Sequence, residues 1–199
     1  DPTPVLDERT GEIFVFFSFR PTRFNNPSKK TDPQGGETYL ISSTDGGDTF
    51  SAPVNMTSLF STSPHYPTPD TNCTGGLCQV CSPTGAGGGG IQTSNGTLLV
   101  PGYHEDCNWM EFVESGRLGE REHSHIWRSD THGKSWYLTP RFGPFTAEGT
   151  LVELFDGRLR YNFRVDCDGS GKDLLRPGWH GCAMNCSGGR WGSAAHCRR

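Results

Sequence analysis

Long hydrophobic runs are missing from this sequence, and none of its apolar stretches approaches the roughly 20 residues that a membrane-spanning helix needs. An excess of one charge is missing too, because 18 Lys and Arg residues are interspersed with 22 Asp and Glu residues, for a formal net charge of −4. Without a basic stripe, nucleic-acid binding is not expected. Asp1 is followed by no apolar leader, so no signal peptide or transit segment is visible.

Helix-forming runs are also scarce, whereas the 199 residues include 27 Gly and 14 Pro. This composition favours many short strands that are joined by tight turns. Runs rich in β-branched and aromatic residues predict the strands, which are expected at residues 13–17, 38–42, 90–94, 97–100, 124–128, 150–154 and 158–164.

Two of the expected turns connect neighbouring strands as hairpins. Asn95-Gly96 lies between two apolar runs, which predicts a two-residue turn in which both positions have positive φ. Asp156-Gly157 marks the second hairpin. In its second strand Leu159, Tyr161 and Phe163 alternate with polar residues, which predicts one apolar face and one polar face.

Three segments show no such pattern. Residues 25–36 are polar and read as a loop, and residues 55–90 read as a long surface loop or insertion. The last segment, residues 168–199, is rich in Gly, Cys and Arg and predicts no strand, so it is either a distinct tail or the product of a wrong exon or reading frame.

Cysteine usage is heavy, and four N-x-S/T sequons accompany it. Together they predict an oxidising secretory, extracellular or lysosomal setting, with disulfides whose pairing stays open and with possible glycans. The sequons begin at Asn55, Asn72, Asn95 and Asn185, and the cysteines are Cys73, Cys78, Cys81, Cys107, Cys167, Cys182, Cys186 and Cys197.

The same cysteines allow a zinc site as an alternative. Cys78 and Cys81 form a Cys-x2-Cys pair, and His196 lies beside Cys197. A second Cys-x2-Cys or a regular His pair is lacking, so disulfides are the favoured interpretation and no metal or other cofactor is expected. Redox chemistry at Cys78 and Cys81 is less favoured still, because no βαβ pattern surrounds them.

One short pattern occurs twice, at residues 43–50 and 129–136. Each copy follows an expected strand and places a Ser first, a Gly four residues later, then Thr or Ser, then an aromatic residue. Short side-chain oxygens can accept hydrogen bonds from the backbone of a tight turn, and the aromatic residue can pack between sheets. The residues that carry this pattern are Ser43, Asp45, Gly47, Thr49 and Phe50 in the first copy, and Ser129, Gly133, Ser135 and Trp136 in the second.

This repeat resembles the Asp box of sialidases, although Thr131 stands where the second box would have its aspartate. Three longer stretches resemble the same family and occur in its order, at residues 1–11, 89–103 and 147–164. The resemblance implies an all-β, six-bladed β-propeller that is incomplete, with about three blades in residues 1–165 and an unmatched tail in residues 166–199. In that fold the boxes are structural and join the outer strands of a blade.

The resemblance also implies an exo-α-sialidase chemistry, in which terminal sialic acids are hydrolysed from glycoproteins, glycolipids or oligosaccharides. A tyrosine is the nucleophile of that family, and a glutamate activates it. By resemblance, Glu148 matches this catalytic glutamate, Arg164 matches one of three arginines that bind the substrate carboxylate, and Tyr103 matches a tyrosine that lines the pocket. If Asp156-Gly157 is the turn, Glu148 and Arg164 lie near one another at the open end of the hairpin.

Other parts of the family's site are not matched in this chain. Its first arginine and catalytic aspartate lie upstream of the matched region, and its third arginine and nucleophilic tyrosine lie downstream. Tyr161 does not occupy the place of the nucleophile, and Glu153 is expected to be structural. A non-catalytic propeller that binds glycans or proteins is therefore the main alternative, and a trans-sialidase is a further one. His123, His125 and His132 are expected to be exposed.

Overall fold

A computed structural model describes residues 2–19, 37–62, 81–85, 88–105, 122–142 and 146–165. Within these ranges the regular structure is antiparallel β-sheet, apart from one short helix, α1 (Ser58–Thr62). None of it is a helix long and apolar enough to cross a membrane. The predicted tail at residues 166–199, and the side chains of all eight cysteines, lie outside the described residues.

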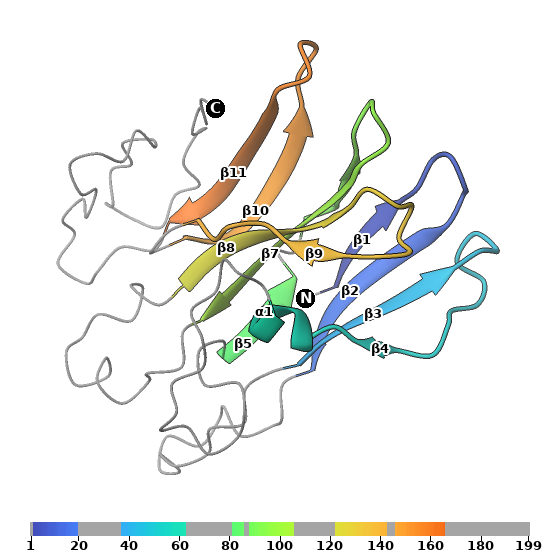
Figure 1. Cartoon of the computed structure of the whole chain (residues 1–199), viewed down its shortest axis with the longest axis horizontal. Coiled ribbons are helices and arrows are strands. Elements are labelled where there is room, and N and C mark those ends of the chain that lie inside the picture. The colour runs from blue at the N-terminus through green and yellow to red at the C-terminus, as the bar shows by residue number, and fades with distance from the viewer. Residues whose placement is uncertain are drawn as a thin grey trace, which may run out of the picture.

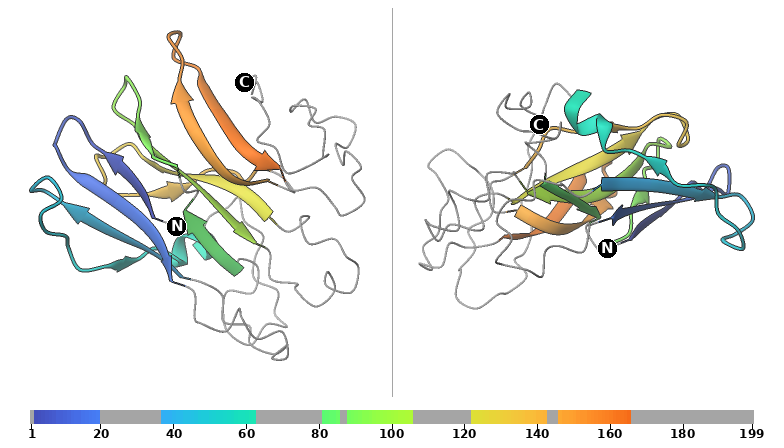
Figure 2. Two further views of the ribbon diagram at one scale, coloured as in Figure 1. Left: turned by 180° about the vertical axis from the view of Figure 1, so that it is seen from behind. Right: turned by 90° about the horizontal axis from the view of Figure 1, so that it is seen from below.

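The strands form three sheets that follow one another in space (Figures 1 and 2). Sheet A contains β1 (Thr3–Leu6), β2 (Ile13–Phe19), β3 (Glu37–Ser43) and β4 (Val54–Asn55) in that order. Sheet B has the order β5 (Cys81–Gly85), β7 (Leu98–Glu105), β8 (Glu122–Ser129) and β9 (Tyr137–Leu138), and β6 (Ile91–Gln92) also pairs with β7. Sheet C consists of β10 (Thr146–Glu153) and β11 (Leu159–Val165).

A four-stranded sheet, a five-stranded sheet and a two-stranded hairpin, all antiparallel, agree with the predicted all-β, incomplete propeller of about three blades. Residues 55–90 were predicted to be an ordered insertion or a surface loop, and the described part of this segment has the features of an ordered insertion. It contributes α1 and β5, and it buries Met56 and Phe60 in the core. No periodic pattern predicted α1, because this helix spans little more than one turn.

Aromatic side chains fill the interface between sheets A and B. Phe16 of β2 stacks on Trp127 of β8, with ring centroids 5.1 Å apart, and meets the edge of Trp136 at 4.9 Å. Phe14 packs edge-on against Trp136 at 5.6 Å. Such rings bury large apolar areas and add a geometric preference of their own, so they fix how one sheet lies on the next.

Sheets A and B each have one of the repeated turns, between β3 and β4 in sheet A and between β8 and β9 in sheet B. In the first, the Ser43 hydroxyl accepts a hydrogen bond from the Gly47 N–H at 2.9 Å, and the Asp45 carboxylate accepts one from the Thr49 N–H at 2.9 Å. Hydrogen bonds from Thr49 are the main reason that the pKa of Asp45 lies well below its usual range.

In the second turn the same backbone conformation is held without a carboxylate. The Ser129 hydroxyl accepts from the Gly133 N–H at 2.9 Å, and the Thr131 hydroxyl accepts from the Ser135 N–H at 2.9 Å. Thr131 thus makes the backbone contact that Asp45 makes in the first turn, since a hydroxyl oxygen can also accept a hydrogen bond.

The aromatic residues of the two turns differ in burial. Trp136 is 7% exposed, as predicted, whereas Phe50 is 44% exposed, so the prediction that it packs between sheets is wrong for the described residues. Trp136 reaches the preceding sheet, where Phe14 and Phe16 receive it. The described part of the chain contains no sheet that stands in the same relation to Phe50.

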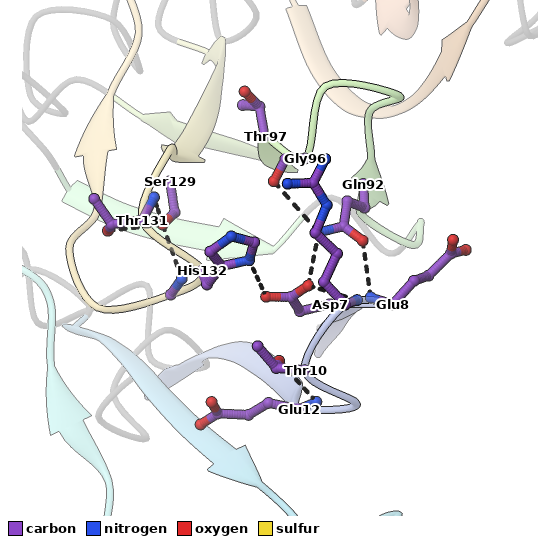
Figure 3. Close-up of polar contacts among 12 residues, drawn as sticks. Asp7, Glu8, Thr10, Glu12, Gln92, Gly96, Thr97, Ser129, Thr131 and His132 are labelled. Atoms are coloured by element: carbon purple, nitrogen blue, oxygen red, sulfur yellow. Dashed lines mark hydrogen bonds and ion pairs between the residues drawn. The ribbon is translucent and has the colours of Figure 1, made fainter.

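A buried carboxylate also joins sheets A and B (Figure 3). Asp7 is fully buried and accepts hydrogen bonds from Gln92 Nε2 at 2.7 Å and from the Arg9 N–H at 3.0 Å, and it pairs with His132 Nδ1 at 2.7 Å. Burial by itself raises the pKa of Asp7, but these hydrogen bonds outweigh it and leave the pKa below its ordinary value. His132 has a φ of 54°, a left-handed conformation that costs a non-glycine residue free energy.

The turn at Asn95-Gly96 differs from the prediction in one respect. Gly96 has a positive φ of 95°, whereas Asn95 does not, and in the second hairpin turn Gly157 has a positive φ of 78°. The Gly96 N–H donates to Thr93 O and the Gly157 N–H donates to Leu154 O, so each turn holds two residues before its glycine. Three-residue loops of this kind need only one left-handed residue, which is why one glycine is enough.

Sheet C packs on sheet B through a second, smaller core. Leu151 and Tyr161 from sheet C meet Leu99 and Ile126 from sheet B. Leu159 was expected on this apolar face but is 40% exposed, at the end of β11 next to the hairpin turn.

Histidines expected to be exposed are instead buried between sheet B and α1. His123 is 6% exposed, and His104 and His125 are fully buried, with their Nδ1 atoms 3.1 Å apart. Phe60 of α1 packs edge-on against both of these rings. Burial lowers the pKa of His125 to about 3 and, together with the charges of His125, His123 and Arg141, lowers that of His104 well below its ordinary range.

Replacing Trp136 by alanine should lower the free energy of unfolding by roughly 3–5 kcal/mol, because it leaves a large cavity against Phe14 and Phe16. The matched control is Phe50→Ala, at the same position of the first turn, which should cost less than about 1 kcal/mol because this ring is 44% exposed. Urea denaturation of the purified chain measures both. Equal losses of unfolding free energy would show that the packing of sheet A on sheet B does not depend on Trp136.

Stability should fall as the pH drops from about 6.5 towards 3. In the unfolded chain a histidine takes up a proton near its ordinary pKa of 6.5, whereas folded His125 stays neutral until about 3, so the unfolded state binds more protons in this window. His125→Asn should therefore reduce the slope of unfolding free energy against pH by about 1.4 kcal/mol per pH unit. Denaturant titrations between pH 6 and 4 measure the slope, and identical slopes would contradict the prediction.

Candidate functional site

Glu148 and Arg164 meet at the open end of the β10–β11 hairpin. Arg164 Nη1 donates to Glu148 Oε1 at 2.7 Å, and the two side chains form an ion pair. Neither is deeply buried, since their side chains are 23% and 37% exposed, respectively. The structure thus brings together the two residues that the sequence analysis placed on opposite strands of one hairpin.

An irregularity in β10 sets the position of Glu148. The pairing of β10 with β11 shifts between Thr146, opposite Val165, and Gly149, opposite Phe163. Three residue steps along β10 therefore match two residue steps along β11, so β10 contains one extra residue, which is a β-bulge. Such a bulge bends a strand and changes the direction of a side chain, and bulges are common beside active sites.

Ser124 of the neighbouring sheet ties this irregular segment down. Its hydroxyl donates to Ala147 O at 2.6 Å, and its N–H donates to Thr146 Oγ1 at 2.8 Å. The Thr146 hydroxyl in turn donates to Phe142 O at 3.0 Å. The backbone on the N-terminal side of Glu148 is thereby held to β8, and the sequence contained no signal for this contact.

Gly149, which departs from the family pattern, has a packing reason in this chain. A β-carbon at this position would lie 2.5 Å from Tyr161 Cε2 and 2.6 Å from Asn162 O, so the ring of Tyr161 occupies the space of a side chain. Burial raises the pKa of Tyr161, which keeps its hydroxyl protonated. Tyr161 is therefore built into the core, in agreement with its exclusion as a nucleophile.

Tyr103 lies on β7 and is 7% exposed. Its cross-strand neighbours are Thr84 on β5 and Ser124 on β8. Since Ser124 holds the residue before Glu148, Tyr103 is connected to the Glu148 strand through one intervening residue. Its small exposed area leaves little of the ring available to a ligand in this conformation.

Glu153, on the same strand as Glu148, lies at the opposite end of sheet C. Its carboxylate accepts hydrogen bonds from the Ser94 N–H at 2.7 Å and from the Ser94 hydroxyl at 2.9 Å. These bonds link the β6–β7 turn to β10. The geometry is that of a structural contact between sheets B and C.

Metal ligands do not cluster in the part of the chain that the structure describes, where no group of three or more His, Cys, Asp or Glu side chains could hold an ion. The Cys78 and Cys81 side chains, on which the zinc alternative depends, lie outside that part.

The arrangement at the hairpin end can serve two kinds of chemistry. A guanidinium binds a ligand carboxylate through paired, charge-assisted hydrogen bonds. A carboxylate beside it can accept a proton from a hydroxyl that is brought within hydrogen-bond reach. Because the Glu148–Arg164 pair is partly exposed, both groups are accessible from outside the sheets.

Comparison with known proteins supports the same family at the level of sequence. The chain is 28% identical over 177 residues to an exo-alpha-sialidase of Arthroderma benhamiae, a match that covers 82% of this chain and 35% of that protein. It therefore spans about a third of the length of this curated relative. No family model matches the chain.

Solved structures show the same fold. The Hadza microbial sialidase Hz136 aligns with a TM-score of 0.60 and 24% identity, over 85% of this chain and 29% of that one. A Trypanosoma rangeli sialidase in complex with sialic acid aligns with a TM-score of 0.56 and 22% identity, over 83% of this chain and 24% of that one. With its sheets, their order and the aligned structures in agreement, the chain has the fold of a partial sialidase-type β-propeller, and its curated relatives are named as sialidases.

Proposed function

We propose that this chain supplies one wall of the active site of an exo-α-sialidase, which hydrolyses terminal sialic acids from glycans. The observation that carries the proposal is the hydrogen bond between Glu148, on the bulged strand β10, and Arg164, on β11. Relatives named as exo-alpha-sialidases, and a structural neighbour that is a sialidase in complex with sialic acid, support it.

The chemistry of the substrate explains why these two residue types belong together. Sialic acid carries a carboxylate on the carbon that is attacked, so an anionic nucleophile would meet like-charge repulsion, and sialidases use a tyrosine instead. In our proposal Glu148 is the general base that takes the proton of that tyrosine. Arg164 is one of the guanidinium groups that bind the substrate carboxylate, and Tyr103 lines the pocket beside it.

The described residues supply only part of such a site. The catalytic aspartate, two further arginines and the nucleophilic tyrosine that the family resemblance implies have no match in this sequence. We therefore propose that the polypeptide alone hydrolyses nothing and that the activity belongs to a longer parent protein.

The purified chain should show no turnover of a fluorogenic sialoside. Clear hydrolysis that Glu148→Ala abolishes would overturn this expectation and would mean that the remaining groups come from within the chain. Hydrolysis that Glu148→Ala leaves intact would point to a contaminating enzyme and calls for a new preparation.

In the longer parent protein, Glu148→Gln should lower kcat by at least about a hundredfold, because proton transfer by a positioned side chain typically contributes 10²–10⁴-fold. The matched control is Glu153→Gln, on the same strand, which loses a contact to Ser94 at the opposite end and should leave kcat nearly unchanged. Steady-state kinetics on the fluorogenic sialoside measures both. A parent that binds sialosides without turnover would instead favour the non-catalytic propeller.

A further inference from the structure

One sequon lies on a well-defined turn that the proposed activity does not use. Asn95, Gly96 and Thr97 form the turn between β6 and β7, and Asn95 is exposed. This turn lies at the same end of the sheets as the β10–β11 turn, as the contact of Ser94 with Glu153 shows. The Glu148–Arg164 pair lies at the other end of that hairpin.

The side chain of Asn95 has a fixed orientation. Its Oδ1 accepts hydrogen bonds from the Thr97 N–H at 3.1 Å and from the Thr93 hydroxyl at 2.7 Å. Because the carboxamide oxygen points back to the turn, the amide nitrogen is on the opposite branch of an exposed side chain. A substituent on that nitrogen would leave both hydrogen bonds intact.

Asp156 makes the equivalent contact in the β10–β11 turn. Its Oδ1 accepts a hydrogen bond from the Arg158 N–H at 3.1 Å, and Arg158 follows a glycine of positive φ. Asn95 Oδ1 likewise accepts from the N–H of the residue that follows a glycine of positive φ. The turn thus needs an acceptor oxygen at this position but not an amide nitrogen. The side-chain amide nitrogen of Asn95 is therefore not needed to hold the turn.

Thr97, the third residue of the sequon, is buried once the sheet has formed. It is 8% exposed, and its hydroxyl donates to Asp130 Oδ1 at 2.7 Å. Gly96 is covered by the guanidinium of Arg9, whose atoms lie 2.7–2.9 Å from the position of a β-carbon there. An enzyme that must grip the whole sequon could act only before β7 joins β8.

We propose that Asn95 is an N-glycosylation site that is modified before the chain folds. Asn95 Nδ2 attacks the anomeric carbon of an oligosaccharide carried on a lipid diphosphate. The new C–N bond forms as the bond from that carbon to the diphosphate oxygen breaks; the lipid diphosphate leaves with the bonding electrons, and the amide proton passes to a base of the transferase. This places the chain in the secretory pathway, as its cysteine usage also suggests.

The glycan would project from the end of the sheets that is remote from Glu148 and Arg164. It would therefore not compete with a sialylated ligand at the open end of sheet C. This inference does not rest on the proposed function, because neither Glu148 nor Arg164 takes part in it.

The test is translation of the full chain, fused to a cleavable leader peptide, in a cell-free system with microsomes. Protease-protected chains are treated with an amidase that releases N-glycans in heavy-oxygen water, which converts an occupied asparagine to labelled aspartate, and the peptide with Asn95 is analysed by mass spectrometry. We expect label at Asn95. Unlabelled Asn95 in protected chains would overturn the proposal.

Variants separate the sequon from the fold. Asn95→Asp keeps the acceptor oxygen, as Asp156 shows, and should lose one glycan while it folds normally. Thr97→Ser keeps both the sequon and the hydroxyl that bonds Asp130, so it should remain glycosylated, whereas Thr97→Val should not. A further measurement tests the order of events: folded chain made without glycosylation and then offered to detergent-solubilised microsomes should stay unlabelled. Labelling of this folded chain would overturn modification before folding.

Discussion

Apolar contact between neighbouring sheets is the constraint on which the rest of this structure depends. Phe14 and Phe16 of sheet A receive Trp127 and Trp136 of sheet B, and a second set of side chains around Tyr161 attaches sheet C to sheet B. A two-stranded hairpin is at best marginally stable in water by itself. The hairpin that carries Glu148 and Arg164 is therefore ordered by its neighbour, and the geometry of the site follows from that packing.

The polar side chains at the two ends of the sheets have different roles. At one end lie polar contacts that join turns to each other, namely Asp7 with Gln92 and His132, and Glu153 with Ser94. At the other end lie Glu148 and Arg164. The hydrogen bonds that join these turns thus lie away from the groups that are proposed to act on a ligand, and an exposed turn such as that of Asn95 can carry a modification without affecting them.

The fold tolerates some changes of residue type where the local hydrogen bonds and packing can be kept. Thr131 accepts the backbone hydrogen bond that Asp45 accepts in the sister turn, because either oxygen can be the acceptor. Gly149 leaves room for the ring of Tyr161 beside the bulge, where a β-carbon would collide with it. Departures from the family pattern at these positions therefore do not prevent the fold.

The sequence by itself determined the local features: the longer strands β2, β3, β7, β8, β10 and β11 and their order, the turns that end in Gly96 and Gly157, and the approach of Glu148 to Arg164, which follows from hairpin geometry. The tertiary structure alone decided which residues are buried, since burial depends on what distant segments bring. His123 and His125 were expected to be exposed and are covered by α1 and sheet B, while Phe50 matches Trp136 in pattern but has no sheet to receive it among the described residues. The bulge at Glu148 and its tie to Ser124 were equally invisible, because the first is an irregularity in the pairing of β10 with β11 and the second is a contact between sheets B and C, and neither leaves a trace in residue periodicity.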